Sequence, residues 1–162
     1  MIRIAKLTDY GIVVLTHVVR ENAGALHTAR DLAERAQLPL PTVSKLLKAL
    51  VGAGLLVSHR GVRGGYALAR RPEQISVSEI IAAIEGPIAI TECGSGGGQC
   101  GLEQGCATRS NWGRISRTVQ EALDALTLAD MASPLPPGWT GSARPPGSRA
   151  AVPLAQAARG TP

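Results

Sequence analysis

The chain has 162 residues, of which 44% are hydrophobic, and a formal net charge of +5; this is enough apolar material for one ordinary domain, or for a small domain with extensions. Aromatic residues make up only 2% and Phe is absent, so the core is aliphatic and stacking of single-stranded nucleic acid on aromatic rings is excluded. No signal peptide is recognisable in the sequence, and no apolar run is as long as a membrane span. Three cysteines cannot all pair, so we expect a cytoplasmic protein with no membrane partner and with free or metal-bound thiols.

The charge is unevenly distributed along the chain. Residues 1–71 carry eleven Lys and Arg against four Asp and Glu, whereas residues 72–132 carry three against eight. Residues 133–162 add three Arg and no acid. A basic N-terminal half joined to an acidic segment predicts a polyanion-binding module attached to a second unit.

Apolar spacing predicts helices over residues 4–20, 29–36 and 41–51. Thr28 is a candidate cap for the second helix, and Pro41 suits the first position of the third. The third helix has a buried stripe at i, i+3, i+4 and i+7 and a polar outer face; the outer residues are Thr42, Ser44, Lys45 and Lys48. A short helix, a tight turn and such a second helix are typical of a helix-turn-helix, although a helical hairpin in any small α-domain has the same pattern.

The residues after the third helix favour the DNA-binding interpretation. Two short apolar runs, 55–58 and 66–69, are predicted strands on either side of a glycine-rich tip that carries Arg60 and Arg63. A hairpin directly after a recognition helix is a wing, and arginines at its tip can contact phosphates or enter the minor groove. An exposed loop with incidental charge is the alternative.

The second half of the chain predicts three further features. Ser76 and Glu79 have capping-box spacing and open a helix that ends at Gly86. From Ala107 an apolar stripe at helical spacing predicts one helix of about six turns, which either forms a dimer interface or packs within the monomer. From Ser133 onward Pro, Gly and Ala dominate, which predicts a disordered tail.

All three cysteines lie between these units, in the sequence CGSGGGQCGLEQGC. Six and then five residues separate them, and most of these are glycine or polar. Ordering so glycine-rich a loop is entropically costly, so three thiols within it suggest a metal centre. An iron–sulfur cluster, a zinc site with one further ligand, a reversible disulfide and unliganded thiols are the alternatives, although the gaps between the cysteines fit short zinc knuckles poorly.

Five features follow one another along the chain: KLTDYG, RGVRGGYAL, SVSEIIAAIEG, three cysteines and a helix with Trp112. In this order they resemble the IscR/NsrR family of bacterial iron–sulfur transcriptional regulators over about residues 1–131. Within that family, regulators of the SUF assembly operon are most similar. The resemblance implies a homodimer that binds double-stranded promoter DNA and a [2Fe–2S] or [4Fe–4S] cluster on Cys93, Cys100 and Cys106. It also implies DNA contacts from Thr28 and Tyr66 in addition to the third helix and the wing.

The chain departs from the IscR-like pattern at one position. Those members have a His three residues after the last cysteine, where this chain has Arg109, and a protonated guanidinium is not an ordinary ligand. The NsrR-like branch uses an Asp in the first helix of the partner subunit, and Asp9 matches that position. Asp9 is therefore the candidate fourth ligand; an interaction with the helix dipole is the alternative.

We therefore predict a mainly α fold with a small β-hairpin wing, and no enzyme. Residues 1–86 form a winged-helix DNA-binding domain, 87–106 a cluster-binding loop, 107–131 a dimerisation helix and 132–162 a tail. The predicted function is a repressor-type regulator that senses an iron–sulfur cluster and controls SUF-type assembly genes. Nitric oxide or redox sensing through the same cluster is the alternative within this class, and a zinc or cluster carrier without a DNA role is the alternative of another class.

Overall fold

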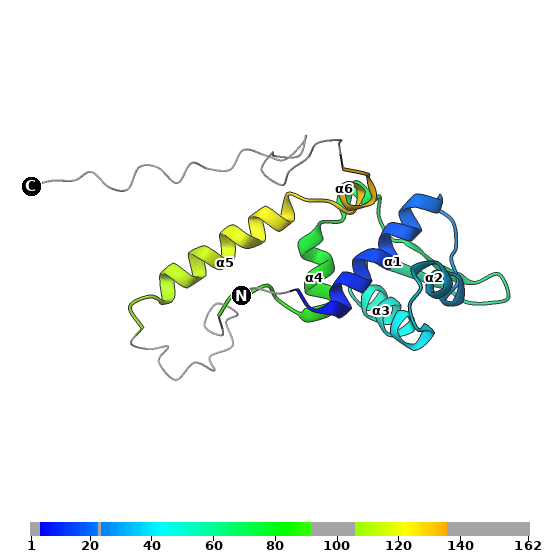
Figure 1. The fold of residues 1–162 in the computed structure, drawn as a ribbon, viewed down its shortest axis with the longest axis horizontal. Helices are drawn as coiled ribbons and strands as arrows, with labels where there is room; N and C mark the ends of the chain where they lie inside the picture. The colour runs from blue at the N-terminus through cyan, green and yellow to red at the C-terminus, as the bar shows by residue number, and fades with distance from the viewer. Residues whose placement is uncertain (1–3, 23, 92–105, 136–162) are drawn as a thin grey trace, which may run out of the picture.

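The computed structural model describes residues 4–22, 24–91 and 106–135. These residues form helices joined by one antiparallel hairpin, so the predicted mainly α class with a β-hairpin is confirmed (Figure 1). In chain order the elements are α1 (Lys6–Asn22), α2 (Ala29–Ala36), α3 (Leu40–Gly52), β1 (Leu56–His59), β2 (Gly65–Leu68), the 3₁₀ turn η1 (Pro72–Gln74), α4 (Val77–Glu85), α5 (Arg109–Asp124) and α6 (Leu128–Ala132).

An aliphatic core holds the N-terminal helices together. α1 contributes Val14, Leu15 and Val18, all fully buried, and α2 contributes Leu32. The predicted stripe of α3 is buried along its whole length. Each such side chain stabilises the fold by about 2 kcal/mol through its removal from water, so aliphatic burial accounts for the stability of a module almost without aromatics.

α3 begins one residue earlier than predicted. Pro39 is the N-cap, and its carbonyl accepts hydrogen bonds from the N–H groups of Thr42 and Val43. Pro41 lies in the first turn, where its missing N–H leaves no carbonyl of the helix unpaired. Gly54, at φ +71°, turns the chain from α3 into the hairpin.

The hairpin is attached to the helical module through its second strand, β2. β1 and β2 pair from Leu56 with Leu68 to His59 with Gly65. Tyr66 also exchanges both backbone hydrogen bonds with His27, at 2.8 and 2.9 Å, in the segment between α1 and α2. A Cβ on Gly65 would lie 2.8 Å from the His27 carbonyl oxygen, so the close approach of these two segments requires glycine there.

The helix predicted over about six turns from Ala107 is instead two helices. α5 ends at Asp124, and the connecting residues pair with the segment before α4: the Val77 N–H donates to the Leu126 carbonyl, and the Leu128 N–H donates to that of Ile75. Thr127 then caps α6 in a capping box with Asp130. Leu128 is completely buried, so core packing of α6 and the Thr127 cap interrupt the helix.

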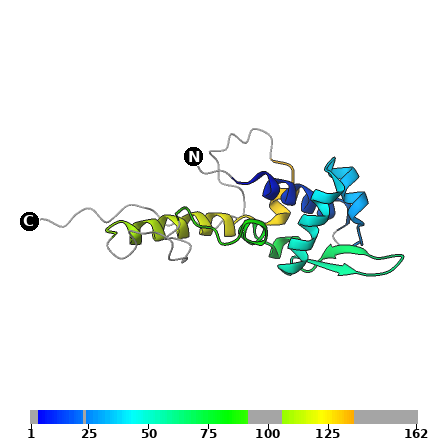
Figure 2. The ribbon, with the colours of Figure 1, turned by 90° about the horizontal axis from the view of Figure 1, so that it is seen from below.

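α5 and the hairpin lie at opposite ends of the molecule. In Figures 1 and 2 α5 extends away from the helical module on one side, while the hairpin projects from the other. No helix among the described residues is long and apolar enough to cross a membrane. Cys93, Cys100 and the predicted tail from 136 onward lie outside the described residues.

Candidate DNA-binding surface and cysteine site

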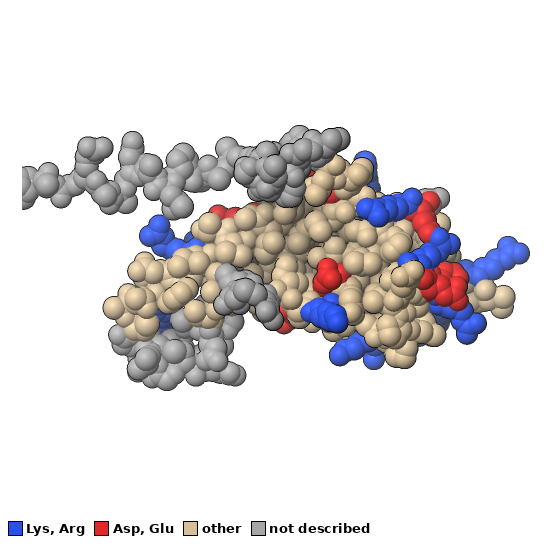
Figure 3. Space-filling view, viewed as in Figure 1, with Lys and Arg blue, Asp and Glu red and all other residues tan. Residues whose placement is uncertain are grey.

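The outer face of α3 carries the polar and basic side chains expected of a recognition helix. Ser44, Lys45 and Lys48 are exposed, and Thr42 is half-buried. The stripe of Val43, Leu46, Leu47 and Leu50 anchors the opposite face. Figure 3 shows Lys and Arg side chains gathered at the end of the molecule where Figure 1 places α2, α3 and the hairpin, so the geometry of this face is compatible with the predicted DNA contacts.

Thr28 is the N-cap of α2, as predicted. Its Oγ1 accepts the Asp31 N–H at 3.1 Å and donates to the Asp31 carboxylate at 2.7 Å. The residue is exposed, at a helix N-terminus whose remaining N–H groups suit an anion. The proposed DNA contact by Thr28 therefore stays a prediction about that N-terminus.

The three predicted wing contacts, Arg60, Arg63 and Tyr66, differ in their surroundings. Arg60 and Arg63 are exposed at the hairpin tip. Tyr66 is half-buried and packs against the core cluster, and its backbone holds the hairpin on His27. The position of Tyr66 therefore has a structural explanation in the attachment of the wing to His27, while its DNA contact stays a prediction.

Cys106 is the cysteine that the structure describes, three residues before α5 begins. Its Sγ lies 3.3 Å from the Thr108 hydroxyl. That hydroxyl holds the pKa of the Cys106 thiol below its ordinary value, and the backbone N–H groups of Thr108 and Arg109 and the Arg109 charge add to the effect. The thiolate is the form that binds soft metals, so Cys106 is prepared as a ligand.

Asp9 lies in the first turn of α1 and is exposed. It lines a cavity together with Ile4, Lys6, Glu85 and Met131. Because Glu85 is the last residue of α4, Asp9 lies near the point where the chain leaves α4 toward the cysteine segment. Among the described residues no group of three or more His, Cys, Asp and Glu could hold a metal, and the role of Asp9 as fourth ligand stays a prediction.

Glu85 makes a contact that the sequence did not reveal. Its carboxylate accepts the Ala5 N–H at 3.0 Å and the hydroxyl of Thr8, which is fully buried. The carboxylate thus serves the N-terminus of α1, where a negative charge is favourable. The end of α4, immediately before the cysteine segment, is thereby fixed to α1.

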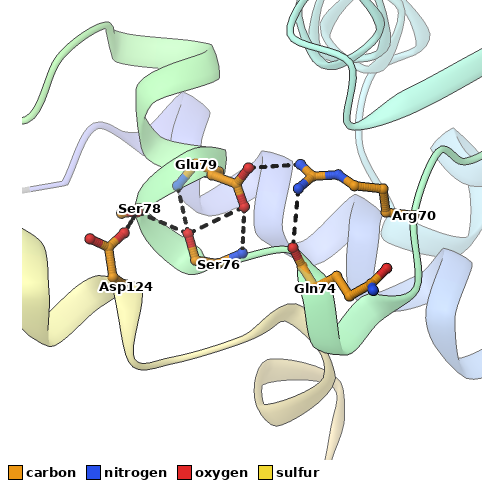
Figure 4. Close-up of polar contacts among 6 residues, drawn as sticks. All are labelled: Arg70, Gln74, Ser76, Ser78, Glu79 and Asp124. Carbon is orange, nitrogen blue, oxygen red and sulfur yellow. Dashed lines mark hydrogen bonds and ion pairs between the residues drawn. The ribbon is translucent and has the colours of Figure 1, made fainter.

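A second polar network connects the end of α5 with the end of the hairpin (Figure 4). The Ser78 hydroxyl donates to Asp124 at the C-terminus of α5 and lies 2.9 Å from the Ser76 hydroxyl. Ser76 forms the predicted capping box with Glu79, and the Arg70 guanidinium donates to Glu79 at 2.7 Å. Sequence alone predicted the capping box but not the roles of Arg70, Ser78 and Asp124, which are distant in the chain.

α5 leaves its apolar stripe exposed toward its N-terminus. Trp112 and Ile115 are 37% and 44% exposed, and Ser116 is the buried residue of this helix. The charges are also divided: Arg109, Arg114 and Arg117 lie in the first part, and Glu121 and Asp124 in the last turns. Within the described residues this apolar stripe has little to pack against.

A helix-turn-helix with an exposed basic outer face, followed by an anchored basic hairpin, defines a winged-helix DNA-binding protein. Comparison with known proteins narrows the class, because residues 4–134 match the family model Rrf2, described as an iron-dependent transcriptional regulator. The chain belongs to the Rrf2 family. It is therefore a transcriptional regulator and no enzyme, and the alternative of a carrier without a DNA role is set aside.

Individual relatives agree with this assignment. Protein rrf2 of Nitratidesulfovibrio vulgaris is 30% identical over 75% of this chain and 81% of its own length. The structure of CymR, the global cysteine regulator of Bacillus subtilis, aligns with a TM-score of 0.65 at 30% identity, covering 82% of this chain and 97% of CymR. IscR of T. potens aligns with a TM-score of 0.60 at 30% identity, covering 80% and 85%. The resemblance to IscR-type regulators is confirmed.

Proposed function

We propose that the protein is a cytoplasmic regulator that binds promoter DNA as a homodimer, senses an iron–sulfur cluster held by Cys93, Cys100 and Cys106, and represses genes for SUF-type cluster assembly. The observation that carries the proposal is the joining, in one chain, of a winged helix to a cysteine whose thiolate is stabilised at the start of α5. The description of the family as iron-dependent and the likeness to IscR support the same function.

The residues present fit an iron–sulfur cluster as a donor set. Cys106 offers a stabilised thiolate, and two further thiols follow from the sequence. Asp9 is the proposed fourth ligand, contributed by the partner subunit, because Arg109 cannot bind a metal. When bound, the cluster would supply iron–thiolate bonds that depend on iron supply and oxidation.

The proposed coupling to DNA uses both ends of the cysteine segment. At one end Glu85 fixes α4 to the buried Thr8 of α1 and to the N–H of Ala5, the residue before α1. The other end leads into α5, whose last residue, Asp124, accepts the Ser78 hydroxyl, and the network continues to Arg70, two residues after β2 (Figure 4). A change in the placement of α5 relative to α4 would therefore alter both the contacts that hold α1 and the contacts that hold the end of the wing. Operator affinity would change as a result.

The homodimer is supported by the surface of α5. Burial of Trp112 and Ile115 against a second copy would remove an apolar stripe from water. A two-fold axis that sets two α5 helices antiparallel would place the basic first part of one helix beside the acidic end of its partner, which is electrostatically favourable. Two recognition helices would then face two half-sites of an operator.

A redox or nitric oxide sensor that uses the same cluster is the second candidate. The observation that favours it is the stabilised Cys106 thiolate, since thiolates are the form that oxidants attack. Exposure of the loaded protein to nitric oxide, peroxide or an iron chelator, followed by titration of one operator, separates these signals. The iron-sensing proposal predicts that the chelator alone abolishes the regulated binding.

Selection of genomic fragments with purified protein, followed by fluorescence-anisotropy titration, tests the DNA part of the proposal. Lys45→Ala and Lys48→Ala should each weaken binding and lower the salt dependence by about one phosphate contact. Lys6→Ala removes the same charge on α1, outside the helix-turn-helix, and should leave both quantities unchanged. Equal effects of all three substitutions would contradict recognition by α3.

A further inference from the structure

The tip of the wing presents an apolar side chain that the fold does not explain. Val62 is 107% exposed, far more than Ile4 at 51% or Leu135 at 64%, which are themselves among the most exposed large hydrophobic residues of the described chain. It stands between Arg60 and Arg63, both exposed. A β-branched apolar residue at the outermost point of a basic hairpin contributes nothing to the core, so its chemistry is available to a partner.

The hairpin holds Val62 in a defined place. Val62 and Arg63 are the two central residues of a turn closed by a hydrogen bond of 2.9 Å from the Gly64 N–H to the Gly61 carbonyl. Gly61 has φ +113°, and a Cβ on Gly64 would lie 2.3 Å from the His59 carbonyl oxygen. Both glycines are therefore required for this tight tip, and the pairing of Tyr66 with His27 fixes its base.

We propose that Val62 makes the wing selective for A·T base pairs by entering the minor groove, with Arg60 and Arg63 on the flanking phosphates and groove walls. The inference rests on the proposed DNA-binding function and adds a specificity-determining residue to it. In the minor groove A·T pairs offer acceptors only, whereas guanine adds its 2-amino donor. An isopropyl group cannot accept a hydrogen bond from that amino group and would also collide with it.

Two further properties favour the minor groove. Proteins that bind the minor groove frequently insert apolar side chains between its base steps, so this groove accepts apolar groups. A·T-rich segments narrow the groove and strengthen its negative potential, which attracts arginine. A single tip with Arg, Val and Arg in four residues combines both forms of recognition, whereas Arg60 and Arg63 alone would respond to phosphate positions and groove width and would not detect the guanine 2-amino group.

Inosine substitution of an operator distinguishes the two grooves. In an operator selected from genomic DNA, each A·T pair is replaced in turn by I·C, which keeps the minor-groove face of A·T, and by G·C, which adds the 2-amino group. For the pairs under the wing we expect I·C to change the Kd less than twofold and G·C to raise it about tenfold. Val62→Thr keeps the side-chain shape but supplies an acceptor, and should reduce the G·C effect to less than threefold.

Val57→Thr, on β1 of the same hairpin, is the matched control and should keep the tenfold effect. Equal losses of affinity for I·C and G·C operators would place the tip in the major groove. An unchanged G·C effect in Val62→Thr would show that Val62 does not take part in recognition. Either result would overturn the inference about Val62 and leave the proposed DNA-binding function intact. Failure of the unmodified protein to select any operator would overturn the proposed function as well.

Discussion

Substitution of Glu85 tests the attachment of the cysteine segment to α1. Its carboxylate accepts hydrogen bonds from the Ala5 N–H at 3.0 Å and from the Thr8 hydroxyl. In Glu85→Ala the Thr8 hydroxyl, which is completely buried, has lost its acceptor, and an unsatisfied buried group costs about 1–3 kcal/mol. We expect a loss of about 2 kcal/mol in the free energy of unfolding, or about 6 °C in Tm.

Glu85→Gln keeps a carbonyl acceptor and loses only the charge at the N-terminus of α1, so we expect it to cost about 0.5 kcal/mol. Glu73→Ala is the control, because Glu73 is exposed and its ion pair with the exposed Arg71, at 3.4 Å, lies on the surface; it should change stability by less than about 0.5 kcal/mol. Urea unfolding followed by circular dichroism, at one protein concentration, measures all three. A loss in Glu85→Ala no greater than in Glu73→Ala would refute the role of this contact.

Three further predictions concern charge, thiol reactivity and assembly. Partial burial raises the pKa of Glu79, but the hydrogen bond from the Ser76 N–H and the Arg70 guanidinium outweigh this effect, so the net pKa is lowered from 4.5. The stability that Glu79 adds relative to Glu79→Gln should therefore be present above about pH 5 and disappear as the pH falls through the lowered pKa of the folded state. Urea unfolding of both proteins from pH 6 to 3 measures this difference. Thr108→Val should raise the pKa of Cys106 and slow its alkylation at pH 7.5 in the apo protein, which peptide mass spectrometry measures. An equal slowing in urea would show that the folded contact between Thr108 and Cys106 is not the cause. Ile115→Glu should weaken the dimer about 100-fold because two copies lose about 1.5 kcal/mol each, whereas Gln120→Glu adds the same charge off the stripe and should keep the dimer in sedimentation equilibrium.

The sequence predicted the elements whose signals are local. The stripe of α3, the cap of α2 by Thr28 and the capping box of Ser76 with Glu79 each involve residues within one or two turns, and each is present in the structure. The hairpin was predicted from glycines and two short apolar runs, and its strands differ from the prediction by one residue at each end. Local backbone preferences determine these features, so no knowledge of the tertiary fold was needed.

The contacts that connect the proposed sensor with the DNA-binding module could not be predicted in this way. Glu85 is far in sequence from Thr8, and Ser78 is far from Asp124. The break between α5 and α6 arises because the backbone of Leu126 and Thr127 forms a β-bridge with that of Ser76 and Val77. The spacing of Thr127 and Asp130 carried a capping signal for α6, but the apolar periodicity continued through it and concealed the break.

In the proposed function one metal-dependent site controls operator binding. The most direct measurement is the Kd for a selected operator, by anisotropy under anaerobic conditions, of the same preparation before and after removal of iron, with iron and sulfide determined in both. We expect the loaded protein to contain iron and sulfide and its Kd to differ at least tenfold from that of the stripped protein. Cys106→Ser should behave as stripped protein in either condition. A preparation that takes up no iron and sulfide on reconstitution, or equal Kd values with and without them, would contradict the proposed function.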